Sequence, residues 1–170
     1  YKLWALADYR QGAIDEMNVV LDYNASCESD IYRFDGIQQD IEPHLLDEED
    51  PLNWSDPQDH PIIWEQYING LEIFQNMVNA HNNANNDSLI FGVAIPRWLN
   101  DTQPDGKIYH QIVQDIVDYV AIMNYNAYDG SYLDSQEEIF YGTSISKPNS
   151  VYVGYETMEI HWKENTALTP

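Results

Sequence analysis

Short apolar runs alternate with longer amphipathic stretches along this 170-residue chain, and that alternation restricts its fold more than any other feature. No Asn-Gly or similar hairpin signal separates one apolar run from the next, so the strands are expected to run parallel with helices between them. Several runs are apolar throughout, which is typical of strands that are covered on both faces. The sequence therefore predicts an α/β fold with a parallel sheet.

Five apolar runs predict strands, and four amphipathic stretches predict helices. The expected strands cover residues 2–7, 34–42, 89–95, 119–125 and 151–156, and the expected helices cover residues 13–23, 62–80, 108–117 and 135–143. One side of the longest expected helix carries, at helical spacing, Ile63, Tyr67, Leu71, Phe74 and Val78. Residues 44–61 form an acidic, proline-rich connection whose length is typical of functional or disordered segments.

Both an open doubly wound sheet and a closed barrel satisfy this alternation. No glycine-rich phosphate loop follows the first expected strand, which argues against the nucleotide-binding version. We therefore expect a (β/α)8 TIM-type barrel that is incomplete in this chain, with about five βα units. Because a closed barrel of this type needs eight strands and about 250 residues, residues 1–170 are interpreted as a single domain, a partial barrel from a longer protein.

The charge balance restricts the partners. The chain has 29 acidic residues against seven Lys and Arg, for a formal net charge of −22. Repulsion from phosphates disfavours nucleic acid and anionic membrane surfaces, and no apolar run approaches the ~20 residues that cross a bilayer. This composition suits an extracellular or periplasmic location and leaves the oligomeric state open. The single cysteine, Cys27, excludes an internal disulfide and is expected to be a buried, inert thiol.

Carboxylates enter the second expected strand on one face. Residues of equal parity in a strand share a face, so Gln38, Asp40 and Glu42 point one way while Ile37 and Ile41 point the other. If the isoleucines pack on helices, the three polar side chains face the barrel interior. Two close carboxylates push one pKa up, which leaves a proton donor beside an ionised partner. This arrangement suits acid catalysis, although an interior hydrogen-bond cluster that only fixes the barrel has the same pattern.

Residues 34–42, FDGIQQDIE, resemble the signature of the chitinase-like family 18 glycoside hydrolases, Asp-x-x-Asp-x-Asp-x-Glu on the fourth barrel strand. Asp35, Asp40 and Glu42 match it, whereas Gln38 replaces the first of the two strand-borne aspartates. Residues 118–126, DYVAIMNYN, resemble the sixth strand of that family. The expected strands at 2–7, 89–95 and 151–156 are then similar to its third, fifth and seventh strands, so the chain would hold strands 3 to 7.

The resemblance implies a glycosidase that cleaves a polysaccharide, N-acetylated chains included, without a cofactor. Glu42 would be the general acid that protonates the leaving glycosidic oxygen. Asp40 would orient the substrate's N-acetyl group as that group attacks its own sugar carbon, and Tyr125 would hydrogen-bond it. Such substrate-assisted cleavage needs no second protein carboxylate.

Three alternatives remain open. Glu156 ends the fifth expected strand and could act with Glu42 as the acid/base and nucleophile pair of a retaining glycosidase, about 5–5.5 Å apart. A metal-dependent hydrolase could use Asp40, Glu42 and His44 as ligands, although Pro43 is expected to end the strand and turn His44 away, so no metal is expected. The third alternative is a barrel that binds carbohydrate without turning it over.

Polar and aromatic residues follow the strands where they end. Carbohydrate sites combine aromatic rings with a few oriented hydrogen-bond donors, and the carboxyl ends of the strands form the active face of such barrels. The residues expected to bind substrate there are Gln38, His44, Arg97, Trp98, Asn124 and Asn126.

Overall fold

The computed structural model describes residues 1–100, 106–124 and 135–154. Its centre is a sheet of four strands in the order β1-β2-β3-β4, and every neighbouring pair is parallel. The strands are β1 (Gly36–Gln39), β2 (Ile90–Pro96), β3 (Tyr119–Met123) and β4 (Val151–Gly154). The parallel α/β sheet predicted from the sequence is confirmed.

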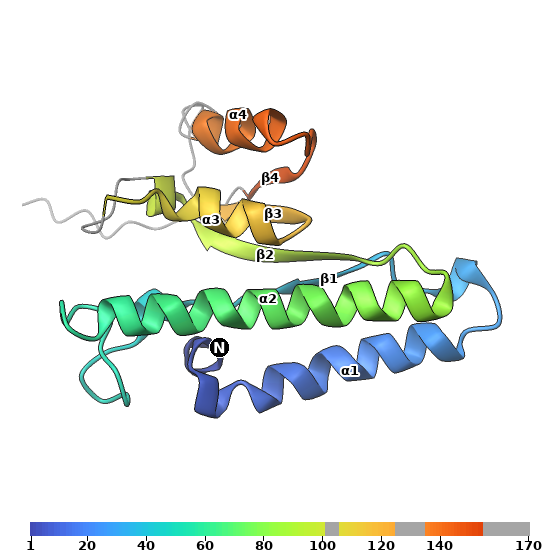
Figure 1. Ribbon diagram of the computed structural model, residues 1–170, viewed down its shortest axis with the longest axis horizontal. Coiled ribbons are helices and arrows are strands. Elements are labelled where there is room, and N and C mark those ends of the chain that lie inside the picture. Colours follow the sequence, from blue (N-terminus) through green and yellow to red (C-terminus); the bar gives the residue numbers. More distant parts are fainter. Residues whose placement is uncertain (101–105, 125–134, 155–170) are drawn as a thin grey trace, which may run out of the picture.

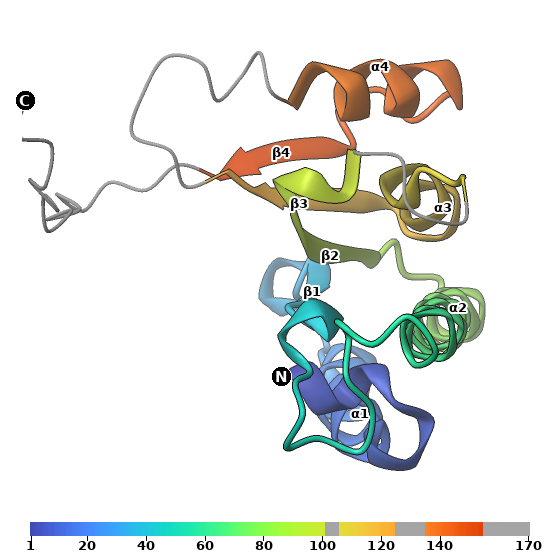
Figure 2. The same cartoon turned by 90° about the vertical axis from the view of Figure 1, so that its left-hand side faces the viewer.

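Helices alternate with the strands along the chain. They are α1 (Gln11–Ser26), α2 (His60–Asn85), α3 (Tyr109–Ile116) and α4 (Gln136–Ser144). Figure 1 shows α1 packed alongside α2. In Figure 2, α2 and α3 lie along one face of the sheet, and α1 and α4 flank it beside β1 and β4. Helices were predicted at all four of these places.

The main core lies between the sheet and α2. Phe91, Val93 and Ile95 of β2 are fully buried, and the Phe74 ring of α2 meets the Phe91 ring at a centroid distance of 6.0 Å. The apolar side predicted for α2 is buried along its whole length, which confirms the helical spacing read from the sequence.

The strand expected at residues 2–7 is wrong. That segment forms two short 3-10 helices, η1 (Lys2–Ala5) and η2 (Ala7–Tyr9). Its backbone does not pair with the sheet. Its apolar side chains pack in the interior instead, where Leu6 joins Leu46 and Ile63 in a small buried cluster. The buried Arg10 guanidinium also donates to the carbonyl oxygens of Ala5 and Gln66, which ties the segment to α2. A short apolar run does not by itself distinguish these arrangements.

The ends of two elements and the exposure of one side chain also differ from the prediction. β1 is shorter than the expected strand at both ends, because only Gly36–Gln39 pair with β2, and the 3-10 turn η4 (Pro43–Leu45) follows. α2 runs five residues past the expected end to Asn85, and Asn86 then adopts a left-handed conformation with φ of 52°. The added turn is stabilised by Asn82, whose side-chain amide exchanges hydrogen bonds with the backbone of Leu89. Cys27, expected to be buried, is only half-buried.

Within the described ranges, no helix is both long enough and apolar enough to cross a membrane.

Candidate functional site

The carboxyl ends of the four parallel strands bring distant parts of the chain to one edge of the sheet. β1 ends at Gln39 and is followed by Asp40 and Glu42. β2 ends at Pro96 and leads into the 3-10 turn η5 (Arg97–Asn100). This edge therefore gathers the acidic residues and the Arg-Trp pair that the sequence suggested for a site.

The side chains of β1 alternate between two environments. Ile37, Gln39 and Ile41 are buried, and the two isoleucines belong to the core formed with the helices. Gln38 and Asp40 are exposed on the opposite face. The predicted alternation is confirmed, and Gln39 shares the buried face with the isoleucines, as the period of two requires.

Glu42 and His44 meet in a half-buried pair. His44 Nε2 lies 3.5 Å from Glu42 Oε2, and the two side chains are 18% and 26% exposed respectively. Pro43 was expected to turn His44 away from this face. That expectation is wrong, because η4 is a tight turn in which Glu42 O accepts a hydrogen bond from Leu45 N, and the turn returns the imidazole to the carboxylate.

The environment of His44 favours its neutral form. Burial lowers the pKa of His44, and the nearby carboxylates of Glu42 and Asp40 act in the opposite direction but do not cancel the effect. The Trp98 ring stands edge-on to the imidazole, with the ring centroids 5.2 Å apart. A neutral imidazole held in this way can orient the Glu42 carboxyl group by contact. It does not add the positive charge that an imidazolium would place beside that group.

The residues proposed as metal ligands do not form a metal site. Within the described ranges, no group of three His, Cys, Asp or Glu side chains comes together closely enough to hold an ion, and Asp40, Glu42 and His44 are all described.

Arg97 is exposed and Trp98 is half-buried, and both follow the carboxyl end of β2. Asn124 follows the carboxyl end of β3, where its side chain is fully buried and its amide donates to Ser135 Oγ at 3.4 Å. This hydrogen bond links the end of β3 to the start of α4.

Three of the predicted site residues, Tyr125, Asn126 and Glu156, lie outside the described residues. The structure therefore does not place them relative to Glu42.

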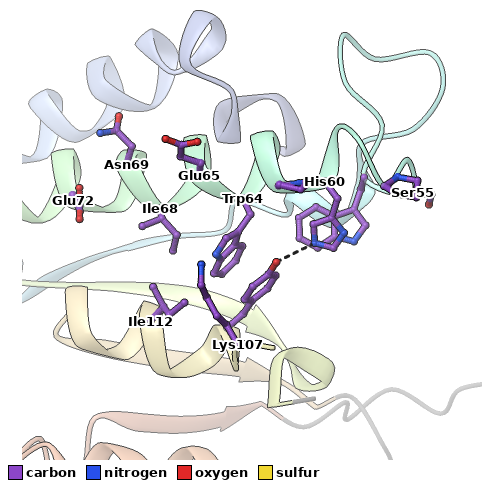
Figure 3. Close-up of a pocket in the computed structure, with 13 residues that line it drawn as sticks. Ser55, His60, Trp64, Glu65, Ile68, Asn69, Glu72, Lys107 and Ile112 are labelled. Carbon is purple, nitrogen blue, oxygen red and sulfur yellow. Dashed lines mark hydrogen bonds between the residues drawn. The ribbon is translucent and has the colours of Figure 1, made fainter. Parts of the chain in front are cut away.

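A groove that sequence reasoning missed lies between α2, α3 and the loop before α2, with a volume of about 1000 Å³ (Figure 3). Aromatic rings form one end of it. The His60 ring lies 4.1 Å from Trp54, and Tyr109 Oη lies 3.4 Å from His60 Nε2. Tyr109 also stacks on Trp64 with a centroid distance of 3.6 Å.

Little in the sequence pointed to this groove. Trp64 lies on α2 and is 6% exposed, but its ring also lines the groove. Trp54, an aromatic residue within the acidic connection at residues 44–61, was the available signal.

Comparisons with protein-family models, curated proteins and solved structures found no match for this chain.

Proposed function

We propose that this chain is part of a glycoside hydrolase-like (β/α)8 barrel that cleaves glycosidic bonds in a polysaccharide, with Glu42 as the general acid. The observation that carries the proposal is the Glu42–His44 pair at the carboxyl end of β1, with the Trp98 ring from the end of β2 against it. Barrels of this type carry their catalytic residues at the carboxyl ends of the strands.

The sheet supports the barrel part of the proposal. Four strands lie side by side in chain order, each pair parallel, which is the repeating arrangement of a βα barrel. The face away from the core carries small side chains such as Ala94 and Ala121. Gly92 on that face has no room for a side chain, since a Cβ there would lie 2.3 Å from the Tyr119 ring. The glycine thus leaves room for the Tyr119 ring of the neighbouring strand.

The chemistry requires two proton transfers. In its protonated form, the Glu42 carboxyl group would give its proton to the leaving glycosidic oxygen as the bond to the sugar carbon breaks and the N-acetyl oxygen bonds to that carbon. The Glu42 carboxylate would then take a proton from the water that attacks the same carbon and displaces the N-acetyl oxygen. Asp40, exposed two residues earlier in the chain, would orient the N-acetyl group of the substrate that attacks this carbon. Neutral His44 would act as a positioning residue that holds the Glu42 carboxyl group.

The variant Glu42→Gln tests this role. Loss of the proton donor is expected to lower the rate of hydrolysis at least about a hundredfold, while binding of the sugar is retained because the amide keeps the shape of the side chain. Release of reducing ends from an N-acetylated β-linked polysaccharide measures the rate, and calorimetric titration measures the binding. Glu48→Gln is the matched control, since Glu48 is an exposed glutamate of the same loop. Undiminished hydrolysis by Glu42→Gln would end the proposal.

A second candidate function is carbohydrate binding without turnover. Gln38 favours it, because this exposed side chain beside Asp40 stands where the resembled signature has an aspartate. An amide cannot take up the proton that an aspartate could share with Asp40. Under this alternative, the native protein binds the polysaccharide and releases no reducing ends.

A further inference from the structure

Rings connect the Glu42–His44 pair to the groove between α2 and α3. Trp98, which meets His44 edge-on, has its ring centroid 6.2 Å from that of Trp54. Trp54 then packs on His60, which contacts Tyr109 within the groove. The groove also lies next to the pair, because Trp54 and Trp64 line both this groove and a small cavity of about 10 Å³ beside His44 and Trp98.

The groove lining combines apolar surface with polar groups of both hydrogen-bonding kinds. Ile68 of α2 and Ile112 of α3 face one another, and Lys107 lies beside Trp64 (Figure 3). The polar members of the lining are Ser55, His60, Glu65, Asn69, Glu72 and Lys107. Sugars offer the matching surface, because each ring has an apolar face for aromatic contact and hydroxyl groups that donate and accept at its edge.

We propose that this groove binds sugar units of a polysaccharide chain that continues past the Glu42 site, so that the protein acts on long chains in preference to short glycosides. The inference rests on the proposed function, since it extends the same substrate over a second surface. Trp54, shared between the two places, would be the point where the chain passes from one to the other.

The charges and the aromatic rings of the lining separate this ligand from other classes. Two carboxylates, Glu65 and Glu72, and the net charge of −22 repel an anionic chain. The same charges do not repel a basic peptide, because the groove holds one ammonium, that of Lys107, against these two carboxylates. The aromatic rings at one end of the groove are what favour a neutral sugar chain over such a peptide.

The test compares long and short substrates. Trp54→Ala is expected to raise KM for an N-acetylated β-linked hexasaccharide about tenfold, the loss of one aromatic contact. Trp54 also packs against the core and lines the cavity beside His44, so Glu72→Ala is the variant that separates long from short substrates. It is expected to raise KM for the hexasaccharide about fivefold, the loss of one hydrogen bond, and to leave KM for a nitrophenyl disaccharide nearly unchanged, because Glu72 is exposed and lines only the groove. Glu16→Ala, an exposed glutamate of α1, is the matched control.

Binding of the hexasaccharide, measured by calorimetry in a Glu42→Gln background, distinguishes the two proposals. Weaker binding in Trp54→Ala and Glu72→Ala supports the groove even if the native protein hydrolyses nothing, in which case only the catalytic proposal fails. If hydrolysis proceeds and both variants treat long and short substrates as the native protein does, the groove proposal is overturned and the catalytic one stands. Absence of hexasaccharide binding, or binding of a hexalysine peptide in its place, also overturns it.

Discussion

Replacing Phe74 with alanine is expected to lower the free energy of unfolding by about 4 kcal/mol. Phe74 is fully buried in the middle of α2, and its ring packs edge-to-face on Phe91 of β2. Truncation removes the transfer free energy of the ring and leaves a cavity between helix and sheet that neither backbone can close. Such a loss is a large part of the 5–15 kcal/mol that stabilises a typical domain.

Urea denaturation followed by far-UV circular dichroism measures this loss. Phe140→Ala is the matched control, because Phe140 lies on α4 with 67% of its surface exposed and its truncation removes little buried area. The control is expected to change the free energy of unfolding by less than about 0.5 kcal/mol. Equal effects of the two substitutions would contradict the helix-on-sheet core described for α2 and β2.

The same core shows why much of the fold could be predicted. The spacing of Ile63, Tyr67, Leu71, Phe74 and Val78 follows the helical period, and only a helix places these five side chains on one buried face. Likewise, parallel pairing follows from strands separated by helices without hairpin turns. Periodicity over many residues leaves few alternatives.

Short segments contain too few residues for such a periodic pattern. Residues 2–7 are apolar enough for a buried strand, yet they form 3-10 turns that pack on α2 because Arg10, Leu46 and Ile63 hold them there. The contacts of Leu6 with Leu46 and Ile63, and of Arg10 with Gln66, join residues about 40 to 60 positions apart, and no local pattern encodes them. The first of the five expected strands is therefore absent, and the described sheet has four strands.

The candidate site divides in the same way. The exposure of Gln38 and Asp40 opposite Ile37 and Ile41 follows from the period of a strand. The meeting of Glu42 with His44 does not, because it depends on the tight turn that Pro43 begins. The groove could not be predicted from a local pattern, because its lining comes from two helices and a loop that approach one another only after folding.

Glu138 is another feature that the sequence concealed. The helix expected at residues 135–143 is confirmed as α4, but an acidic residue in its first turn is fully buried. Within the described residues, neither carboxyl oxygen of Glu138 has a hydrogen-bond partner. One turn later the packing is tight, because a methyl group on Gly142 would lie 2.8 Å from Ser150 Oγ and 3.0 Å from Gln114 Oε1.

This burial makes stability depend on pH. Burial raises the pKa of Glu138 from 4.5 to about 7, and the negative charge of Glu137 adds to the rise. The folded protein thus binds a proton more tightly than the unfolded chain does. The stabilising contribution of the protonated acid is fully present below about pH 4.5 and is lost as the pH rises through about 7. At 1.36 kcal/mol for each pKa unit, the loss is about 3 kcal/mol.

The variant Glu138→Gln is expected to remove this dependence, because an amide keeps the size of the protonated acid and does not ionise. Its free energy of unfolding should exceed that of the native protein by about 2–3 kcal/mol at about pH 8.5, and the difference should shrink to less than about 1 kcal/mol near pH 5. Urea denaturation at both pH values measures the difference, in which the titrations of the other carboxylates cancel. Glu137→Gln, which removes an exposed neighbouring charge, should leave most of the pH dependence in place. A Glu138→Gln variant that follows the native protein at both pH values would mean that the Glu138 carboxyl group remains in contact with water.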